Sequence, residues 1–188
     1  SKGMNGIVYP YIATMNNTAE GTLRVTFDTG FYADIFYSGA TNGGSKLSIV
    51  PEVYKVPVDG ANVAAKGLTV KNGEVATMEV NFAELSADII KAATIGATGT
   101  SDAATHDLIQ SKASIEEGDY WENIAFVGKT LSGETIIAIL PNAICTSGFE
   151  QEGKNKEGAV GKYTFECHAE LTSDLDTLPW KIYYPKAT

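Results

Sequence analysis

The residues best suited to chemistry lie close together near the C-terminal end of the chain. In the stretch GFEQEGKNKEGAVGKYTFECHAEL, Cys167 is followed by His168, and Glu166 and Glu170 flank the two. A cysteine activated by a histidine can act as a nucleophile. A histidine with two carboxylates can hold a metal ion. The local geometry of the segment decides whether either arrangement can form.

Hydrophobic and polar residues alternate through this segment, which predicts a half-buried β-strand. Successive side chains of a strand point to opposite faces, so Cys167 and His168 cannot act as a pair within it. The predicted buried face carries Tyr163, Phe165, Cys167, Ala169 and Leu171. The predicted opposite face carries Lys162, Thr164, Glu166, His168 and Glu170. A metal site at the last three stays open, although a solvated polar face explains the same pattern.

Other candidate catalytic residues are few. His106 is one of only two histidines, and it lies in the small, polar segment 96–107, which predicts a surface loop. Asp28, Asp34 and Asp119 could serve as catalytic carboxylates, but acids are common in β loops. Asp28 begins an Asp-Thr-Gly sequence, which an aspartyl dyad could use, yet a turn explains it better.

The motifs of the common enzyme classes are missing from the sequence. The chain contains no nucleophile elbow, no P-loop, no dinucleotide fingerprint, no H-E-x-x-H and no C-x-x-C. We therefore predict that the protein is not an enzyme. We also predict no catalytic residues, no cofactor and no metal.

Composition is typical of a single globular domain. The chain has 188 residues, of which 44% are hydrophobic and 20% charged, so we predict one domain over residues 1–188. The formal net charge of −9 argues against a protein that grips nucleic acid through its phosphates. No apolar run approaches the ~18 residues of a membrane-spanning helix, and we expect no membrane partner. The first residues also lack the apolar segment of a signal peptide.

Two cysteines do not make a disulfide framework. Cys145 and Cys167 would be neighbours if residues 142–150 and 160–171 formed a hairpin. Nothing else in the sequence indicates an oxidising compartment, so we expect buried reduced thiols. The sequence leaves open whether the two are paired.

Most of the chain predicts short strands separated by turns. Residues 46–58 contain Pro51 and Pro57, which would interrupt a central strand, so this stretch is expected at an edge or in an arm. We place an extended loop or arm within residues 30–60. Asn72-Gly73 predicts a tight hairpin turn. Residues 122–141 predict a second hairpin that turns near Ser132-Gly133.

One amphipathic helix is predicted near residues 82–95. Phe82, Leu85 and Ile89 fall on one helical face, Asn81 can cap the start, and Gly96 can cap the end. The face is apolar throughout, so we expect it to cover an open side of the β core. The predicted fold is mainly β, in the α+β sense, with a β-sandwich or barrel-like core, one flanking α-helix and extended loop or arm regions.

Aromatic residues also suggest contacts between proteins. Tyrosine joins a large apolar ring to a polar tip, which suits protein interfaces. The tyrosines near strands and chain ends are Tyr9, Tyr11, Tyr32, Tyr37, Tyr54, Tyr183 and Tyr184. Ordinary packing explains most single tyrosines, but we expect subunit contacts at Tyr183, Tyr184 and the arm.

The order of these elements resembles a major tail tube protein of a long-tailed, siphovirus-like bacteriophage. One carrier is VATMEVNFAELSADIIKAATIG, in which a strand runs into a single mid-chain helix. The other is the late region, where a strand with LPNA leads to a charged loop. A long alternating strand, an acidic turn and a terminal LPWKIYY strand then follow. The resemblance covers about residues 66–184 and is a pattern rather than a signature motif.

The resemblance implies a structural virion protein that forms hexameric rings. The rings stack into the tail tube, through which double-stranded DNA passes at ejection. Its partners would be further copies of itself and other tail proteins, such as the tape measure and the terminator. It would assemble in the host cytoplasm and reside in the phage tail. Glu166, His168 and Glu170 would then be candidates for a lumen-facing surface, because acids repel DNA.

Three alternatives remain open from the sequence. The chain could be the inner tube protein of a contractile injection machine, which shares the fold. It could be a secreted β-sandwich binding module whose exposed aromatic residues contact carbohydrate or protein. It could also be a small hydrolase or metal enzyme built on Asp28 or on Glu166, His168 and Glu170.

Overall fold

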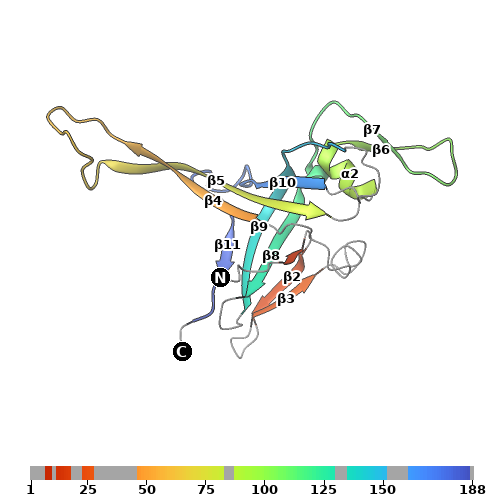
Figure 1. The fold of residues 1–188 in the computed structure, drawn as a ribbon, viewed down its shortest axis with the longest axis horizontal. Helices are drawn as coiled ribbons and strands as arrows, with labels where there is room; N and C mark the ends of the chain where they lie inside the picture. The colour runs from red at the N-terminus through yellow and green to blue at the C-terminus, as the bar shows by residue number, and fades with distance from the viewer. Residues whose placement is uncertain are drawn as a thin grey trace.

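The computed structural model describes residues 7–9, 12–17, 23–27, 46–82, 87–129, 135–151 and 161–186. Within them the fold is mainly β, with one α-helix, as the sequence predicts. A long hairpin projects from one side of the body, and a shorter one projects from the other (Figure 1). In these ranges no helix has the length and apolar character needed to cross a membrane.

The main sheet is antiparallel throughout and curls around one core. Its path runs through β1 (Ile7–Tyr9), β8 (Trp121–Lys129), β9 (Thr135–Cys145), β10 (Gly161–Cys167), β5 (Thr69–Phe82) and β4 (Lys46–Lys55). A seventh strand, β11 (Lys181–Tyr183), pairs with β9. Two small sheets pair β2 (Ile12–Asn17) with β3 (Leu23–Phe27), and β6 (Ala97–Gly99) with β7 (Leu108–Gln110).

Two predicted hairpins are confirmed by the strand register. β8 and β9 pair from Trp121↔Ala143 to Lys129↔Thr135, which matches the expected hairpin. β9 and β10 pair through Phe165↔Cys145 and Cys167↔Ala143, so both cysteines lie in one antiparallel pair. The residues of the expected Ser132-Gly133 turn lie outside the described part.

The core lies on one face of β5, β9 and β10. Tyr163 and Phe165 are each 1% exposed, and Trp121 stacks on Phe165 with ring centroids 4.3 Å apart. The buried cluster comprises Ala76, Met78, Ile89, Ala93, Trp121, Ile124, Ala138, Leu140, Ala143, Cys145, Tyr163, Phe165 and Cys167. Burial of this many large side chains is the main stabilising contribution to the fold.

The strict alternation of strand faces breaks in β8 and β9 at the same place. Leu140 and Ala143 both belong to the core although three positions separate them, and so do Trp121 and Ile124 on the partner strand. Asn142 lies at the break with a φ of 51°, a left-handed conformation that asparagine tolerates better than most residues. The break allows the pair of Trp121 and Ala143 to face the same core as the pair of Ile124 and Leu140.

The helix α2 (Ala87–Thr94) is shorter than predicted and begins later. Phe82 is the last residue of β5, where it pairs with Gly161, so its assignment to the helical packing face was wrong. Leu85 lies outside the described residues. Ile89 is 1% exposed and belongs to the core cluster, which places the helix against β9.

The C-terminal end of α2 is a Schellman motif. Gly96 N–H donates to the carbonyl of Lys91 at 3.0 Å, and Ile95 N–H donates to Ala92 at 3.4 Å. The left-handed residue is Ile95, with a φ of 50°, rather than the predicted Gly96. A Cβ on Gly96 would come within 3.1 Å of the carbonyl oxygen of Gln110, so this glycine allows β7 to approach.

Three further expectations from the sequence were wrong. Asn72-Gly73 is not a hairpin turn, because both residues lie within the continuous strand β5. The segment 96–107 is not a loop throughout, since β6 occupies its start. The alternating strand ends at Cys167, and Leu171 lies in a turn with 86% of its surface exposed.

Candidate interaction surfaces

The most distinctive surface is the hairpin of β4 and β5, whose outer part we call the arm (residues 50–75). Residues 30–45 of the predicted arm lie outside the described residues, whereas 46–60 form β4 and the start of the hairpin loop. β4 is the last strand of the described sheet, as Pro51 predicts for an edge. Beyond the body, none of the other described strands lies beside these two (Figure 1).

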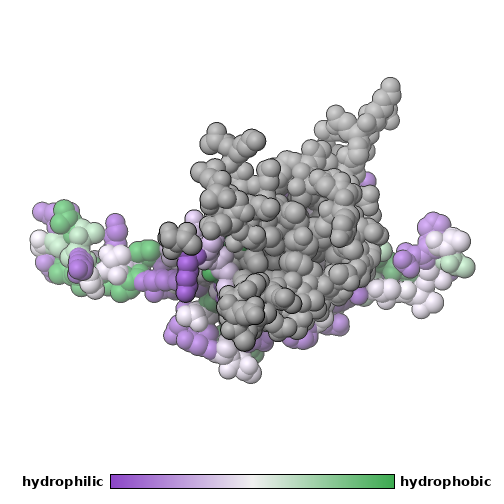
Figure 2. Space-filling view, turned by 90° about the horizontal axis from the view of Figure 1, so that it is seen from below, coloured by the Kyte–Doolittle hydropathy of each residue, from purple (hydrophilic) through white to green (hydrophobic). Residues whose placement is uncertain are grey.

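The arm exposes many large apolar side chains. The described ones are Val50, Val53, Tyr54, Val56, Val58, Val63, Val70 and Val75. A two-stranded hairpin alone is marginally stable in water, and exposed apolar clusters mark sites of association. Figure 2 shows apolar residues along the arm, set among polar ones, as far as its end. The arm therefore has the composition of an interface, and the described residues of its own chain leave it exposed.

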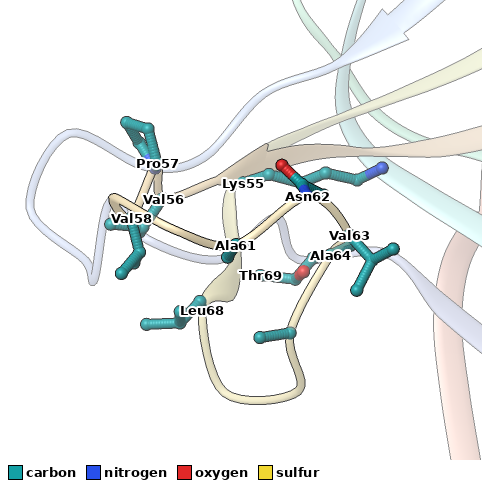
Figure 3. A pocket seen from close by; sticks show the side chains of 11 residues that line it. Lys55, Val56, Pro57, Val58, Ala61, Asn62, Val63, Ala64, Leu68 and Thr69 are labelled. Carbon is teal, nitrogen blue, oxygen red and sulfur yellow. The ribbon is translucent and has the colours of Figure 1, made fainter.

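The end of the arm, residues 56–68, is here called the arm tip. Val56 N–H donates to the Leu68 carbonyl at 2.7 Å and closes its base. Gly60 and Gly67 have φ of 86° and 89°, which side chains rarely adopt, so both glycines permit the chain to turn. The tip encloses an open hollow of about 310 Å³. Aliphatic side chains dominate its lining, and Val58 and Leu68 point to the same side (Figure 3).

A bulge in β5 lies where the arm leaves the body. Glu52 pairs with Gly73 and Val53 pairs with Lys71, so Asn72 is the extra residue. A Cβ on Gly73 would meet the carboxylate of Glu52 at 2.9 Å. The glycine that seemed to mark a turn instead allows Glu52 to lie across the strand.

Glu74 joins the base of the arm to the C-terminal segment. Its carboxylate accepts the backbone N–H of Leu178 at 3.0 Å and the Lys71 ammonium at 2.7 Å. The hydrogen bonds from Lys71 and Leu178 hold the pKa of Glu74 below its ordinary value, although burial acts to raise it. The contact spans 104 positions in sequence, so it fixes the C-terminal segment against the sheet.

A second exposed apolar surface follows β10. We call residues 170–176 the acidic turn, because Glu170, Asp174 and Asp176 lie there and the segment 169–180 contains no lysine or arginine. Leu171 and Leu175 within it are 86% and 64% exposed. Within the turn, Ser173 Oγ donates to the Glu170 carbonyl, and Asp176 N–H donates to the Asp174 carboxylate.

The predicted polar face of β10 is present only along the strand. Glu166 pairs with Thr77, and Thr164 pairs with Glu79, so these four side chains share the face opposite the core. Lys162 forms an ion pair with Glu79 at 3.4 Å. His168 and Glu170 lie beyond the end of the strand. The strand that the sequence extends through all three residues therefore ends before two of them.

His168 is held by its neighbours. Its Nδ1 lies 2.9 Å from the Glu166 carbonyl oxygen, and its ring meets Tyr120 edge to face at 5.5 Å. Its backbone N–H donates to Asn142, and the Asn142 amide donates back to the His168 carbonyl. Across the described ranges, no group of three or more histidine, cysteine, aspartate or glutamate side chains is placed to hold a metal ion.

The two cysteines are free and buried, and neither has a histidine partner in the hydrogen bonds of its thiol. Cys167 donates to the Pro141 carbonyl at 3.0 Å. Burial, with the nearby charges of Glu74 and Glu166, raises the pKa of Cys167 to about 12. A thiol that stays protonated at neutral pH is a poor nucleophile.

The remaining candidate residues do not form a site either. Asp28 and Asp34 lie outside the described residues. Asp119 accepts from Lys112 at 2.6 Å and from the Glu116 N–H at 2.7 Å. Burial acts to raise the pKa of Asp119, but these two hydrogen bonds outweigh it and hold the pKa below its ordinary value. His106 is exposed, and its ring contacts the neighbouring Thr105 hydroxyl.

Sequence comparison does not assign the chain. No protein-family model matches it, and no curated protein is significantly similar to it. A proposal about its function therefore has to start from the surfaces described above. Sequence reasoning missed the Glu74 contact. It predicted an acidic turn after the long strand, but it placed Leu171 on the buried face, whereas Leu171 is 86% exposed.

Proposed function

We propose that this chain is a structural protein that self-assembles into stacked rings, as the major tail tube protein of a long-tailed phage does. The observation that carries the proposal is the arm, an apolar hairpin that projects beyond the sheet without cover from the described residues of its own chain. Apolar side chains on a two-stranded hairpin are stabilised when another molecule covers them.

Self-association also resolves the problem of the sheet edge. β4 ends the described sheet and presents ten residues of backbone, with only Pro51 to interrupt its hydrogen-bonding groups. Exposed edges promote pairing with other chains, and closed assemblies remove them. A hexameric ring whose subunits form a continuous inner barrel would satisfy such an edge in every copy.

In this proposal the polar face of the sheet lines the tube. Glu79, Glu166, Thr77 and Thr164 lie on that face, and the chain carries a net charge of −9. Double-stranded DNA carries one negative charge per ~1.7 Å of its axis, so an acidic lining repels it and keeps it mobile. The protein would reside in the virion tail, with the tape measure and terminator proteins as further partners.

Assembly is the direct test of this proposal. Sedimentation velocity over a concentration series is expected to show a transition from monomer to rings or tubes. Negative-stain electron microscopy is expected to show tubes of constant width. A protein that stays monomeric at every concentration and forms no regular particles contradicts the proposal and favours a binding module.

The lumen assignment has a separate test. Glu79→Lys with Glu166→Lys reverses two charges on the polar face, and neither side chain belongs to the core. Tubes of this variant are expected to form, and fluorescent DNA is expected to bind them where it does not bind the wild type. Equal and negligible DNA binding by both tubes would place this face elsewhere in the assembly.

A further inference from the structure

We propose that the arm tip of one copy docks on the acidic turn of the next copy. The inference rests on the proposed self-assembly and names the two surfaces that meet. Both surfaces expose apolar side chains, and the acidic turn offers carboxylates to the lysines at the end of the arm.

The apolar parts of the two surfaces match in kind. The arm tip exposes Val56, Val58 and Val63, the last with 80% of its surface in solvent. The acidic turn exposes Leu171 and Leu175. The hollow of about 310 Å³ at the tip is lined largely by aliphatic side chains, which suits a leucine inserted from outside. Contact between them would remove from water Leu171 and Val63, the two most exposed large apolar residues of the described chain.

The charges of the two surfaces are complementary. Lys66 lies in the arm tip and Lys55 directly before it, and Asp59 is the one acid between them, so this end of the arm has an excess of one positive charge. The charged side chains of the acidic turn are all carboxylates, because segment 169–180 contains no lysine or arginine. Opposite charges at the rim of an interface favour the correct partner and speed encounter. Two acidic turns would repel each other, because each carries the carboxylates of Glu170, Asp174 and Asp176.

The two surfaces cannot meet within one molecule. The acidic turn is fixed at the body, because Glu166 pairs with Thr77 before it and Leu178 donates to Glu74 after it. The tip begins beyond Thr69, about 17 Å from Glu74 along an extended strand. The tip lies at the far end of the arm in Figure 1. Such a contact between unlike surfaces is heterologous and continues from copy to copy, as stacking requires.

The experiment compares four variants with the wild type in the same sedimentation series. Leu171→Ser with Leu175→Ser removes the apolar part of the turn, and Asp174→Lys and Lys66→Glu each reverse one charge. The exchange variant combines the two charge reversals. Leu171→Ser with Leu175→Ser, Asp174→Lys and Lys66→Glu are each expected to raise the concentration needed for assembly about tenfold, which corresponds to about 1.4 kcal/mol. The exchange variant is expected to recover most of that loss.

Two matched controls lie on the hairpin of β6 and β7, away from both surfaces. Asp102→Lys repeats the charge change, and Leu108→Ser repeats the loss of an exposed leucine. Both are expected to assemble as the wild type does. Circular dichroism and the melting temperature of each monomer show that the variants remain folded.

The outcomes separate this inference from the proposed function. If the wild type assembles and the turn variants assemble equally well, the acidic turn is not the docking surface and the inference is wrong. If Lys66→Glu weakens assembly but Asp174→Lys does not, or the exchange variant fails to recover, the tip docks elsewhere and the inference is again wrong. A wild type that never assembles overturns the proposed function itself.

Discussion

The two halves of β5 have different surroundings although they form one continuous strand. In the body, Ala76 and Met78 are fully buried beneath neighbouring strands. In the arm, Val70 and Val75 remain substantially exposed on a strand with the same pairing to β4. Both halves pair with β4, but only the body half also pairs with β10, and only there are the side chains covered. Residues in the body half of β5 should determine stability, and residues in the arm half should determine association.

The largest effect is expected at the centre of the buried half. Phe165→Ala removes a ring that stacks on Trp121 and lies fully within the core. We expect the free energy of unfolding to fall by about 3–5 kcal/mol, as for other buried phenylalanines. Urea unfolding of dilute monomer, followed by tryptophan fluorescence, measures the loss. A change below about 1 kcal/mol would show that the core tolerates a cavity there.

The helix provides the next test of the buried half. Ile89→Ala should lower the free energy of unfolding by about 2–5 kcal/mol, because Ile89 is the large side chain that joins α2 to the core cluster. Thr94→Ala is a matched control on the exposed end of the helix, although it also removes the hydrogen bond to the Ile90 carbonyl. Similar losses from both changes would contradict the packing described here.

The break in β9 predicts a smaller effect of a different kind. Asn142→Ala places an ordinary side chain at a φ of 51° and deletes the amide that donates to His168. Together these should cost about 1–3 kcal/mol. Asn142→Gly accepts the backbone conformation but also lacks the amide, so the two variants separate the contributions. Equal losses in both would assign the whole effect to the hydrogen bond.

The sequence predicts those features of the body and the arm that depend on contacts between residues close together in the chain. The alternation that buries Tyr163, Phe165 and Cys167 is a property of one strand, and it was predicted correctly. The end of that strand was not predicted, because the apolar Leu171 continues the pattern although nothing covers it. Periodicity indicates which residues share a face but does not indicate where the sheet stops.

Other features depend on partners that are remote in sequence. Asn72-Gly73 has a strong local preference for a turn, but ten residues of pairing with β4 continue the strand and convert the pair into a bulge. The contact of Glu74 with Leu178 joins residues 104 positions apart, and no local pattern in either segment signals it. Both features lie at the base of the arm. The sequence therefore predicted an arm but not its junction with the body.

Acid should loosen the contact between Glu74, at the base of the arm, and the C-terminal segment at Leu178. The pKa of Glu74 lies below its ordinary value of 4.5 in the folded protein, so its contacts contribute stability that is fully present above that value. This contribution is lost as the pH falls through the lower folded pKa. Hydrogen exchange at Leu178 is expected to become faster over that range. In Glu74→Gln the same amide should exchange faster at neutral pH and depend less on pH; an unchanged pH profile would show that another acid controls it.

The smallest effect on stability is expected at the far end of the arm, where the comparison is sharpest. Val63→Ser changes a side chain that is 80% exposed and outside the core cluster, so the monomer's free energy of unfolding should change by no more than about 0.5 kcal/mol. The same change should weaken assembly, because the arm tip is proposed to be covered only between copies. Val63→Ile keeps the apolar surface and is expected to assemble normally. If serine lowers monomer stability as much as it weakens assembly, the arm belongs to the folding unit and the division of β5 into two roles is wrong.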